Sequence, residues 1–280
     1  MSDSVRVTNV GDAMGTVNIY PVDGITAETS GVVFPPHTAP QHDIGAWIIL
    51  DHHQLTLTPG QHQDVPFVLN IPSHHVRSGQ YGGGIVAEFT RLQAATAKNQ
   101  QSSGLMIHIL QRFVIGVHVT LPGPLHANLQ TTGITYHSST PYQTVQIGLH
   151  NTGNMIIHPY GYLRIRDGAG NLLQNLPLKL FAILPQDSIH YPVYILNKAL
   201  QPGTYQAELM LQYEQNQRLF VNTTFSVPAP PATFFSPPPK LVSLSNQPLG
   251  IVYYVILATA LFSLGGGILY WRHTRTNKSV

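Results

Sequence analysis

Apolar residues that alternate with polar ones recur along most of the first 227 residues of the chain. The clearest runs are residues 65–71, 115–121, 145–149, 207–213 and 219–227. Because successive side chains of a β-strand point to opposite faces, this period of two predicts strands with one buried face. Turn-forming pairs such as Pro59-Gly60 and Pro202-Gly203 separate the runs. No amphipathic helix is expected before residue 249, and residues 89–99, the best helix candidate, are expected to form a loop or a short turn.

The two halves of this region repeat one order of turns. Residues 7–12 (VTNVGD) and 149–154 (LHNTGN) each hold an Asn-x-Gly turn, and residues 57–61 (LTPGQ) and 184–188 (LPQDS) each hold a proline turn. A glycine turn then leads into a strand in both halves. This repetition predicts two tandem immunoglobulin-like β-sandwiches, at residues 1–121 and 122–227. The first half lacks a counterpart of residues 127–136, so we expect a missing N-terminal strand and an incomplete N-terminus.

A proline-rich segment follows the predicted sandwiches. Six of the twelve residues 228–239 are proline. Proline fixes φ and has no N–H to donate, which excludes a helix or a central strand here. Residues 228–248 are therefore expected to form an extended stalk.

An uncharged apolar run of 23 residues, 249–271, follows the stalk. As a helix it would be ~34 Å long, enough to cross a ~30 Å hydrocarbon core. Aromatic residues that suit a membrane interface lie near its two ends, namely Tyr253, Tyr254, Tyr270 and Trp271. The cations Arg272, Arg275 and Lys278 follow in the tail 272–280 and predict a cytoplasmic C-terminus. The full expected fold is therefore all-β, two tandem immunoglobulin-like β-sandwiches plus one C-terminal transmembrane α-helix, with the lipid bilayer as a partner of that helix.

The composition excludes several classes of function. Only 9% of the residues are charged, and the chain has no Cys. A chain without Cys has no disulfide framework, no cysteine nucleophile and no thiolate metal site. Three of the 14 Lys and Arg lie in the tail, which leaves 11 against 12 Asp and Glu in the rest of the chain. Nucleic-acid binding requires clustered cations, so nucleic acid is not an expected partner.

No enzyme motif is present. The chain has no G-x-S-x-G elbow, no phosphate-binding glycine loop before a helix and no H-E-x-x-H, and no catalytic residue and no cofactor are predicted. His52-His53 and His62 flank the Pro59-Gly60 turn, and His74-His75 form a second pair. Adjacent residues of a strand point to opposite faces, so each pair supplies one metal ligand per face. Histidine used as a general polar surface residue explains the pattern better, and no metal site is predicted.

Two aromatic residues are candidates for ligand contact. Trp47 is the only tryptophan before the stalk, and Tyr81 lies in a glycine-rich strand. Sugar-binding sites often stack rings on such side chains. The competing interpretation places Trp47 in the core, within the apolar run WIIL. Gly82-Gly83-Gly84, next to Tyr81, predict either a β-bulge or a point of close packing.

The sequence resembles a known family. The segments VRVTNVGD (5–12), LTLTPGQ (55–61) and RSGQYGGGIVAEF (77–89) resemble the peptidoglycan-binding domain of WxL-interacting proteins. The second half, most clearly ILPQDSIHYPVYILNKALQPGTYQAELML (183–211), resembles their so-called host-binding domain. The resemblance implies a surface protein of a Gram-positive-type cell. Its first domain would bind peptidoglycan or another cell-wall glycan, and its second would bind WxL-type surface proteins or host proteins.

The expected function is therefore that of a non-enzymatic, single-pass cell-membrane protein that binds cell wall and tethers surface or host ligands. The alternative is an adhesion or ligand-sensing ectodomain without affinity for peptidoglycan. An exposed apolar sheet edge would instead favour binding of a protein partner by β-augmentation.

Overall fold

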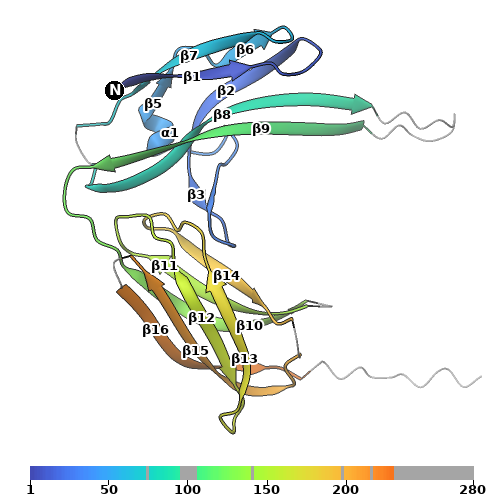
Figure 1. The fold of residues 1–280 in the computed structure, drawn as a ribbon, viewed down its shortest axis with the longest axis vertical. Coiled ribbons are helices and arrows are strands. Elements are labelled where there is room, and N and C mark those ends of the chain that lie inside the picture. The colour runs from blue at the N-terminus through green and yellow to red at the C-terminus, as the bar shows by residue number, and fades with distance from the viewer. Residues whose placement is uncertain (74–75, 95–105, 140–141, 197–198, 215–216, 230–280) are drawn as a thin grey trace, which may run out of the picture. The chain divides into compact units, whose positions relative to one another are not determined.

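The computed structural model describes residues 1–73, 76–94, 106–139, 142–196, 199–214 and 217–229 (Figure 1). The described chain is all-β, with one short helix, α1 (Ile44–Trp47). The expected strand runs are confirmed, the first of them ending at Leu69. The loop expected at residues 89–99 is wrong as far as residue 94, because β8 continues through Ala94 in unbroken pairing with β9. Residues 95–99 lie outside the described residues.

The first sandwich packs a three-stranded sheet against a four-stranded one. Its strands are β1 (Ser2–Thr8), β2 (Gly15–Asp23), β5 (Ile48–Leu50), β6 (Gln54–Leu57), β7 (His62–Leu69), β8 (Gly79–Ala94) and β9 (Met106–Leu121). The sheet orders are β1-β7-β5 and β6-β2-β8-β9, and a small hairpin of β3 (Ile25–Thr26) and β4 (Val32–Val33) stands apart from both. All pairings are antiparallel.

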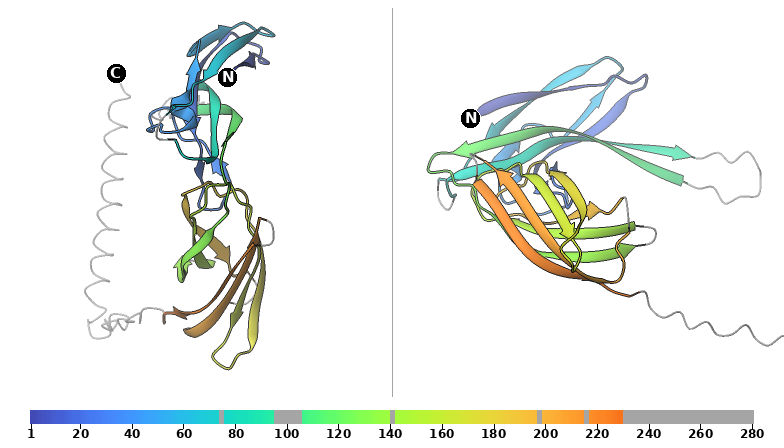
Figure 2. Two further views of the ribbon diagram at one scale, coloured as in Figure 1. Left: turned by 90° about the vertical axis from the view of Figure 1, so that its left-hand side faces the viewer. Right: turned by 60° about the horizontal axis from the view of Figure 1, so that its bottom comes forward.

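The second sandwich has the same number of strands in its two main sheets. Its strands are β10 (Leu129–Ser139), β11 (Tyr142–Asn151), β12 (Tyr160–Arg166), β13 (Leu172–Lys179), β14 (Ser188–Tyr194), β15 (Gly203–Tyr213) and β16 (Gln217–Val227). They form the sheets β10-β11-β14 and β13-β12-β15-β16 (Figures 1 and 2).

Each sandwich has its own core of inward-facing aliphatic side chains. In the first, Ile19, Leu55, Val65 and Ile85 are buried, and in the second the inward row of β15 from Tyr205 to Tyr213 is buried. The interdigitated inner faces are what holds two aligned sheets together. Residues 1–230 nevertheless form one compact unit, so the expected domain boundary at residue 121 stays a prediction.

An asparagine closes the same turn in both sandwiches. In the first, Asn9 Nδ2 donates to the carbonyl oxygens of Ala13 and Leu57, at 2.9 Å each. Its Oδ1 accepts from the Gly11 N–H at 2.9 Å. Leu57 begins the segment that carries the proline turn, so one side chain ties the end of β1 to that turn.

In the second sandwich, Asn151 repeats these contacts in full. Asn151 Nδ2 donates to the carbonyl oxygens of Met155 at 2.9 Å and Ile183 at 3.0 Å, and its Oδ1 accepts from the Gly153 N–H at 3.1 Å. The Asn151 side chain is fully buried, whereas Asn9 is half-buried. The repeat seen in the sequence is thus a repeat of hydrogen bonds.

The proline turns bind these asparagines through the backbone as well. The N–H groups of Gly60 and Gln186 donate to the carbonyl oxygens of Asn9 and Asn151, at 2.8 Å each. Gly60 and Gln186 have φ of 76° and 66°. A residue with positive φ after proline is the signature of a type II turn, which glycine adopts freely and glutamine does not. Gln186 Nε2 donates to the carbonyl oxygen of Gly153 at 2.8 Å, which helps hold this conformation.

A tyrosine after each glycine turn completes the likeness of the two halves. Tyr81 Oη donates to the carbonyl oxygen of Arg77 at 2.8 Å, and Tyr205 Oη to that of Gln201 at 2.7 Å. A tyrosine that bonds the backbone a few residues upstream is typical of immunoglobulin-like sandwiches.

Substitution of Asn151 tests the role of this turn. Asn151→Ala removes three hydrogen bonds, including those to the Met155 carbonyl oxygen and the buried Gly153 N–H, while the Ile183 carbonyl oxygen keeps its bond from the Ile157 N–H. We therefore expect a loss of about 2 kcal/mol in the free energy of unfolding. Urea unfolding of the chain measures it. Asn9→Ala, at the half-buried equivalent, is the matched control and should cost clearly less. Equal costs at the two positions would contradict the role assigned to burial.

Candidate functional site

The β8–β9 hairpin is the most extended element of the first sandwich. Both strands are 16 residues long and pair along their whole length without a register shift. Figures 1 and 2 show the two strands continuing together past the rest of their sheet. Among the described strands β9 pairs only with β8, so the other side of β9 is a sheet edge.

A row of apolar side chains runs along one face of this edge strand. Val117, Val119 and Leu121 are half-buried against the core of the first sandwich. Phe113 and Ile115 continue the same face, but they are 70% and 53% exposed. The face that fills the core at one end of β9 therefore emerges into solvent toward the other end.

The β9 edge lacks the features that usually prevent strands from pairing across molecules. Native edges are commonly short, bulged, or marked by proline or lysine. β9 is long, has no bulge and contains no proline or lysine, and its one arginine, Arg112, is bonded to Glu88. The edge strands β13 and β14 carry Pro177 and Pro192, and β1 carries the exposed charges of Asp3 and Arg6. The edge of β9 is thus the one most open to an added strand among those compared.

A buried carboxylate fixes the middle of the hairpin. Glu88 on β8 is only 7% exposed and lies directly across the ladder from Arg112 on β9. Glu88 Oε2 accepts from Arg112 Nε at 2.6 Å and from Tyr20 Oη at 2.7 Å. These bonds satisfy the acid, which would otherwise be costly to bury.

The same contacts shift two pKa values. Burial alone would raise the pKa of Glu88, but the hydrogen bonds from Tyr20 and Arg112 and the charge of Arg112 lower it overall. Burial and the bond to Glu88 raise the pKa of Tyr20 to about 12. Glu88 is therefore ionised and Tyr20 protonated at neutral pH.

Gly82-Gly83-Gly84 let β8 approach its neighbours closely. A Cβ atom on Gly83 would lie 2.5 Å from Cβ of Ile44, and one on Gly84 would lie 2.8 Å from Cγ1 of Val114. The close-packing interpretation is confirmed. The bulge is wrong, because the β8–β9 register is unbroken across these glycines.

The two predicted ligand contacts lie together in the structure. Trp47, at the end of α1, is 3% exposed, and its ring centroid is 4.8 Å from that of Tyr81. Tyr81 is half-buried and lines a pocket of about 700 Å³ with Asp43 and Arg77. Burial and the nearby charge of Asp43 raise the pKa of Tyr81. A ligand role for either residue stays a prediction. Of the two side chains, that of Tyr81 lines the pocket and is the one a ligand could reach.

The other predicted groups are dispersed or lie outside the described residues. His52 Nδ1 is 3.2 Å from Asp51 Oδ2, and no group of three metal-ligating side chains occurs in the part of the chain that the structure describes. Outside the described residues lie His74-His75, the stalk from residue 230 onward, and the predicted membrane-interface and tail residues Tyr253, Tyr254, Tyr270, Trp271, Arg272, Arg275 and Lys278.

The alternation of residues 115–121 predicts the strand but not the site to which it belongs, and it gives no role to Arg112. A single arginine inside an otherwise uncharged run, MIHILQRFVIGVHVTL, was the available signal. It pointed to a buried acid on a neighbouring strand, but the sequence alone did not say which acid.

The fold of this chain is similar to that of several proteins of known structure. No family model matches the chain, and no curated protein matches its sequence. One similar structure is a chain of the chaperone–tip adhesin complex that is vital for synergistic activation of CFA/I fimbriae biogenesis. It is 15% identical, with 82% of this chain and 93% of that chain covered, at a TM-score of 0.37.

Two further similar structures are also of chaperones. The CsuC–CsuE chaperone–tip adhesion subunit pre-assembly complex, from archaic chaperone-usher Csu pili of Acinetobacter baumannii, is 9% identical over 79% of this chain and 90% of that chain, at a TM-score of 0.35. The periplasmic chaperone SfaE is 11% identical over 81% and 92%, at a TM-score of 0.29.

These findings correct the resemblance drawn from the sequence. Membership of the WxL-interacting proteins is wrong, since no family model matches and the similar structures are fimbrial chaperones. Peptidoglycan, WxL-type proteins and host proteins are wrong as partners on the same findings, and so is the function built on them, including the adhesion or ligand-sensing alternative. The quoted segments are turns and strand ends, and both sandwiches use them for the hydrogen bonds described above, so they reported the fold rather than a ligand.

The predicted localisation, a Gram-positive-type cell membrane crossed once, is wrong as well, and with it the lipid bilayer as a partner. The similar structures include a periplasmic chaperone. In the described ranges no helix is long and apolar enough to cross a membrane. The predicted span, residues 249–271, lies outside those ranges.

Proposed function

We propose that this chain is a non-enzymatic binding protein that holds an extended segment of a partner protein as an added strand along β9. One observation carries the proposal: β9 is a long, regular, apolar edge strand without proline, lysine or a bulge. In strand addition, main-chain hydrogen bonds supply affinity and alternate side chains supply specificity. The edge of β9 offers both.

The exposed apolar side chains supply part of the driving force. Phe113 and Ile115 lie on one face of β9, and Leu110, 48% exposed, lies on the other. Covering a side chain of this size contributes roughly 1.5–3 kcal/mol relative to leaving it in water. A partner segment with alternating apolar residues would cover them while it pairs with the β9 backbone.

Arg112 and Glu88 have a positioning role in this proposal. A one-residue slip of a strand moves every side chain to the opposite face. The partly buried bond between Arg112 Nε and Glu88 Oε2 holds β9 in a single register on β8. It therefore keeps Phe113 and Ile115 on the face that continues the core.

The partner class that we propose is a subunit of a surface fibre. Two of the similar structures are complexes of a chaperone with a tip adhesin or a tip subunit. Co-expression of this chain with secreted fibre subunits encoded near its gene, followed by co-purification, tests the class. The predicted division into immunoglobulin-like domains at 1–121 and 122–227 would place the β9 edge on the first of them.

A charge on the edge should weaken strand addition. We expect Ile115→Asp to weaken binding at least about tenfold, because an added strand would bury the carboxylate. The free energy of unfolding should change little, since the side chain is exposed. Calorimetry with a lysine-flanked peptide of alternating Val and Thr measures the binding, and a peptide with the same residues in blocks controls for composition.

Phe220→Asp is the matched variant for this experiment. Phe220 is an exposed aromatic residue on β16 of the second sandwich, so its replacement should leave peptide binding unchanged. Binding that survives Ile115→Asp, or that fails equally with Phe220→Asp, would rule out the β9 edge as the site.

The positioning pair should show a pH signature. Arg112→Leu leaves the Glu88 charge buried with Tyr20 alone, so we expect a loss of about 3 kcal/mol in unfolding free energy at neutral pH. Because the pKa of Glu88 is lowered in the folded chain, its contribution is present above its ordinary pKa and is lost as pH falls through the folded value. The difference between Arg112→Leu and the unmodified chain should therefore shrink at acid pH, as followed by urea unfolding.

The exposed pair of Arg6 and Asp64 provides the control. Arg6 Nε lies 2.7 Å from Asp64 Oδ1, and both side chains are largely open to solvent. Exposed ion pairs contribute little to stability, so Arg6→Gln should have little effect at any pH. A pH-independent loss for Arg112→Leu would show that the arginine acts by packing alone.

A further inference from the structure

The second sandwich carries a groove that the proposed function does not use. It has a volume of about 530 Å³ and lies where β12 begins and β13 ends. Its walls include the side chains of His158, Tyr160, Lys179 and Phe181. The volume falls within the range of about 300–1,000 Å³ that is usual for small-molecule sites.

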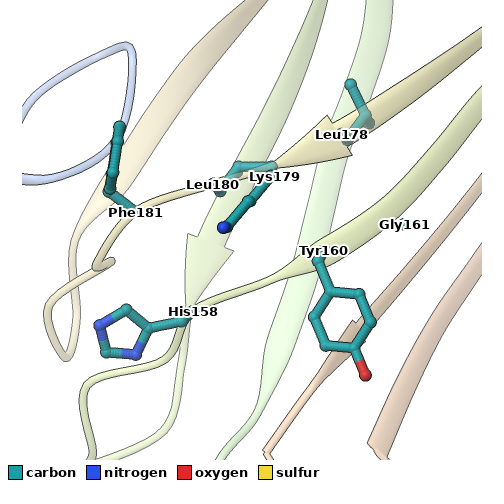
Figure 3. A pocket seen from close by; sticks show the side chains of 7 residues that line it. All are labelled: His158, Tyr160, Gly161, Leu178, Lys179, Leu180 and Phe181. Carbon is teal, nitrogen blue, oxygen red and sulfur yellow. The ribbon is translucent and has the colours of Figure 1, made fainter.

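Strand register places the polar and apolar groups of the groove. Tyr160 on β12 lies across the ladder from Lys179 on β13. Leu178 and Leu180 alternate with Lys179 and are buried in the core, so the lysine side chain points outward. Figure 3 shows it extending from β13 into the space between Phe181 and His158.

The aromatic side chains of the groove are exposed, but hydrogen bonds fix the backbone at Leu180 and Phe181. Tyr160 and Phe181 are 51% and 70% exposed. The Phe181 N–H donates to Ser30 Oγ at 2.7 Å, and the Leu180 N–H donates to the carbonyl oxygen of Pro159 at 2.8 Å. Because this backbone is already ordered, less conformational entropy is lost when a ligand binds against the rings.

The charge of the groove is positive and uncompensated. Among the described residues that line it, Lys179 is the one Lys or Arg, and none is acidic. Lys179 forms no salt bridge with any residue that the structure describes. The other described cations of the second sandwich, Arg164, Arg166 and Arg218, lie on the same outer sheet face, and Glu208 on that face is engaged by Arg164.

We propose that this groove binds a small organic carboxylate with an aromatic or short aliphatic body. The ligand's apolar body would lie against the rings of Tyr160 and Phe181. Its carboxylate would accept a charge-assisted hydrogen bond from Lys179 Nζ, with His158 as a second polar contact. The combination of an apolar wall and a single unpaired cation is what selects a monoanion with an apolar body over a neutral molecule of the same shape.

The test compares two probes that share one fluorophenyl body, one an anion and the other neutral. Fluorine NMR of para-fluorophenylacetate and of the neutral para-fluorophenethyl alcohol is recorded against the full chain. We expect saturable binding of the acid in the millimolar range and at least about tenfold weaker binding of the alcohol. Lys179→Gln should reduce the affinity for the acid to that for the alcohol and leave the alcohol unaffected.

Two variants locate the site. Phe181→Ala should weaken binding of both probes, because it removes a wall that both contact. Arg218→Gln removes a cation of the same sheet face outside the groove and should change neither affinity. Equal affinity for acid and alcohol, binding that is insensitive to Lys179→Gln or Phe181→Ala, or the absence of saturable binding would each overturn the proposal.

Discussion

The continuous pairing of β8 with β9 is the constraint on which the first sandwich depends. The two strands stay in register along 16 residues, which carries one face of β9 from the core out into solvent. The partly buried bond between Glu88 and Arg112 fixes that register, and Gly83 lets β8 pack closely against Ile44 of α1. The edge on which the proposed function rests follows from this one ladder, because β9 is its last strand.

The two sandwiches share the hydrogen bonds of their turns but have different surfaces. In each, an asparagine binds a proline turn through side chain and backbone, and a tyrosine bonds the backbone before its own strand. These contacts satisfy buried polar groups at the ends of strands, where a sheet ladder cannot. The surfaces differ: the first sandwich exposes an apolar edge, and the second gathers its described cations on one sheet face.

The turn motifs explain why the sequence pointed correctly to the fold and wrongly to a family. Asn9, Asn151, Tyr81 and Tyr205 form hydrogen bonds at the turns of both sandwiches, and the tyrosine contact is typical of immunoglobulin-like sandwiches. Residues with such a role recur wherever the fold does, so they say nothing of the ligand. Trp47 shows the same limit, because an aromatic residue in an apolar run suits a sugar-binding platform and a core equally well, and the structure places its side chain 3% exposed.

Alternation and turn chemistry are local properties of the chain, so most of the strands, the turns and the repeat could be predicted from the residues alone. The same alternation predicts residues 115–121 of β9. That β9 is an edge, that Arg112 meets Glu88, and that Phe113 and Ile115 extend beyond the core became apparent only in the folded structure. The order of strands in a sheet, and the length by which one strand extends past its neighbours, depend on pairings between residues distant in sequence. The period of two cannot reveal them, because it is the same in a central strand and in an edge strand.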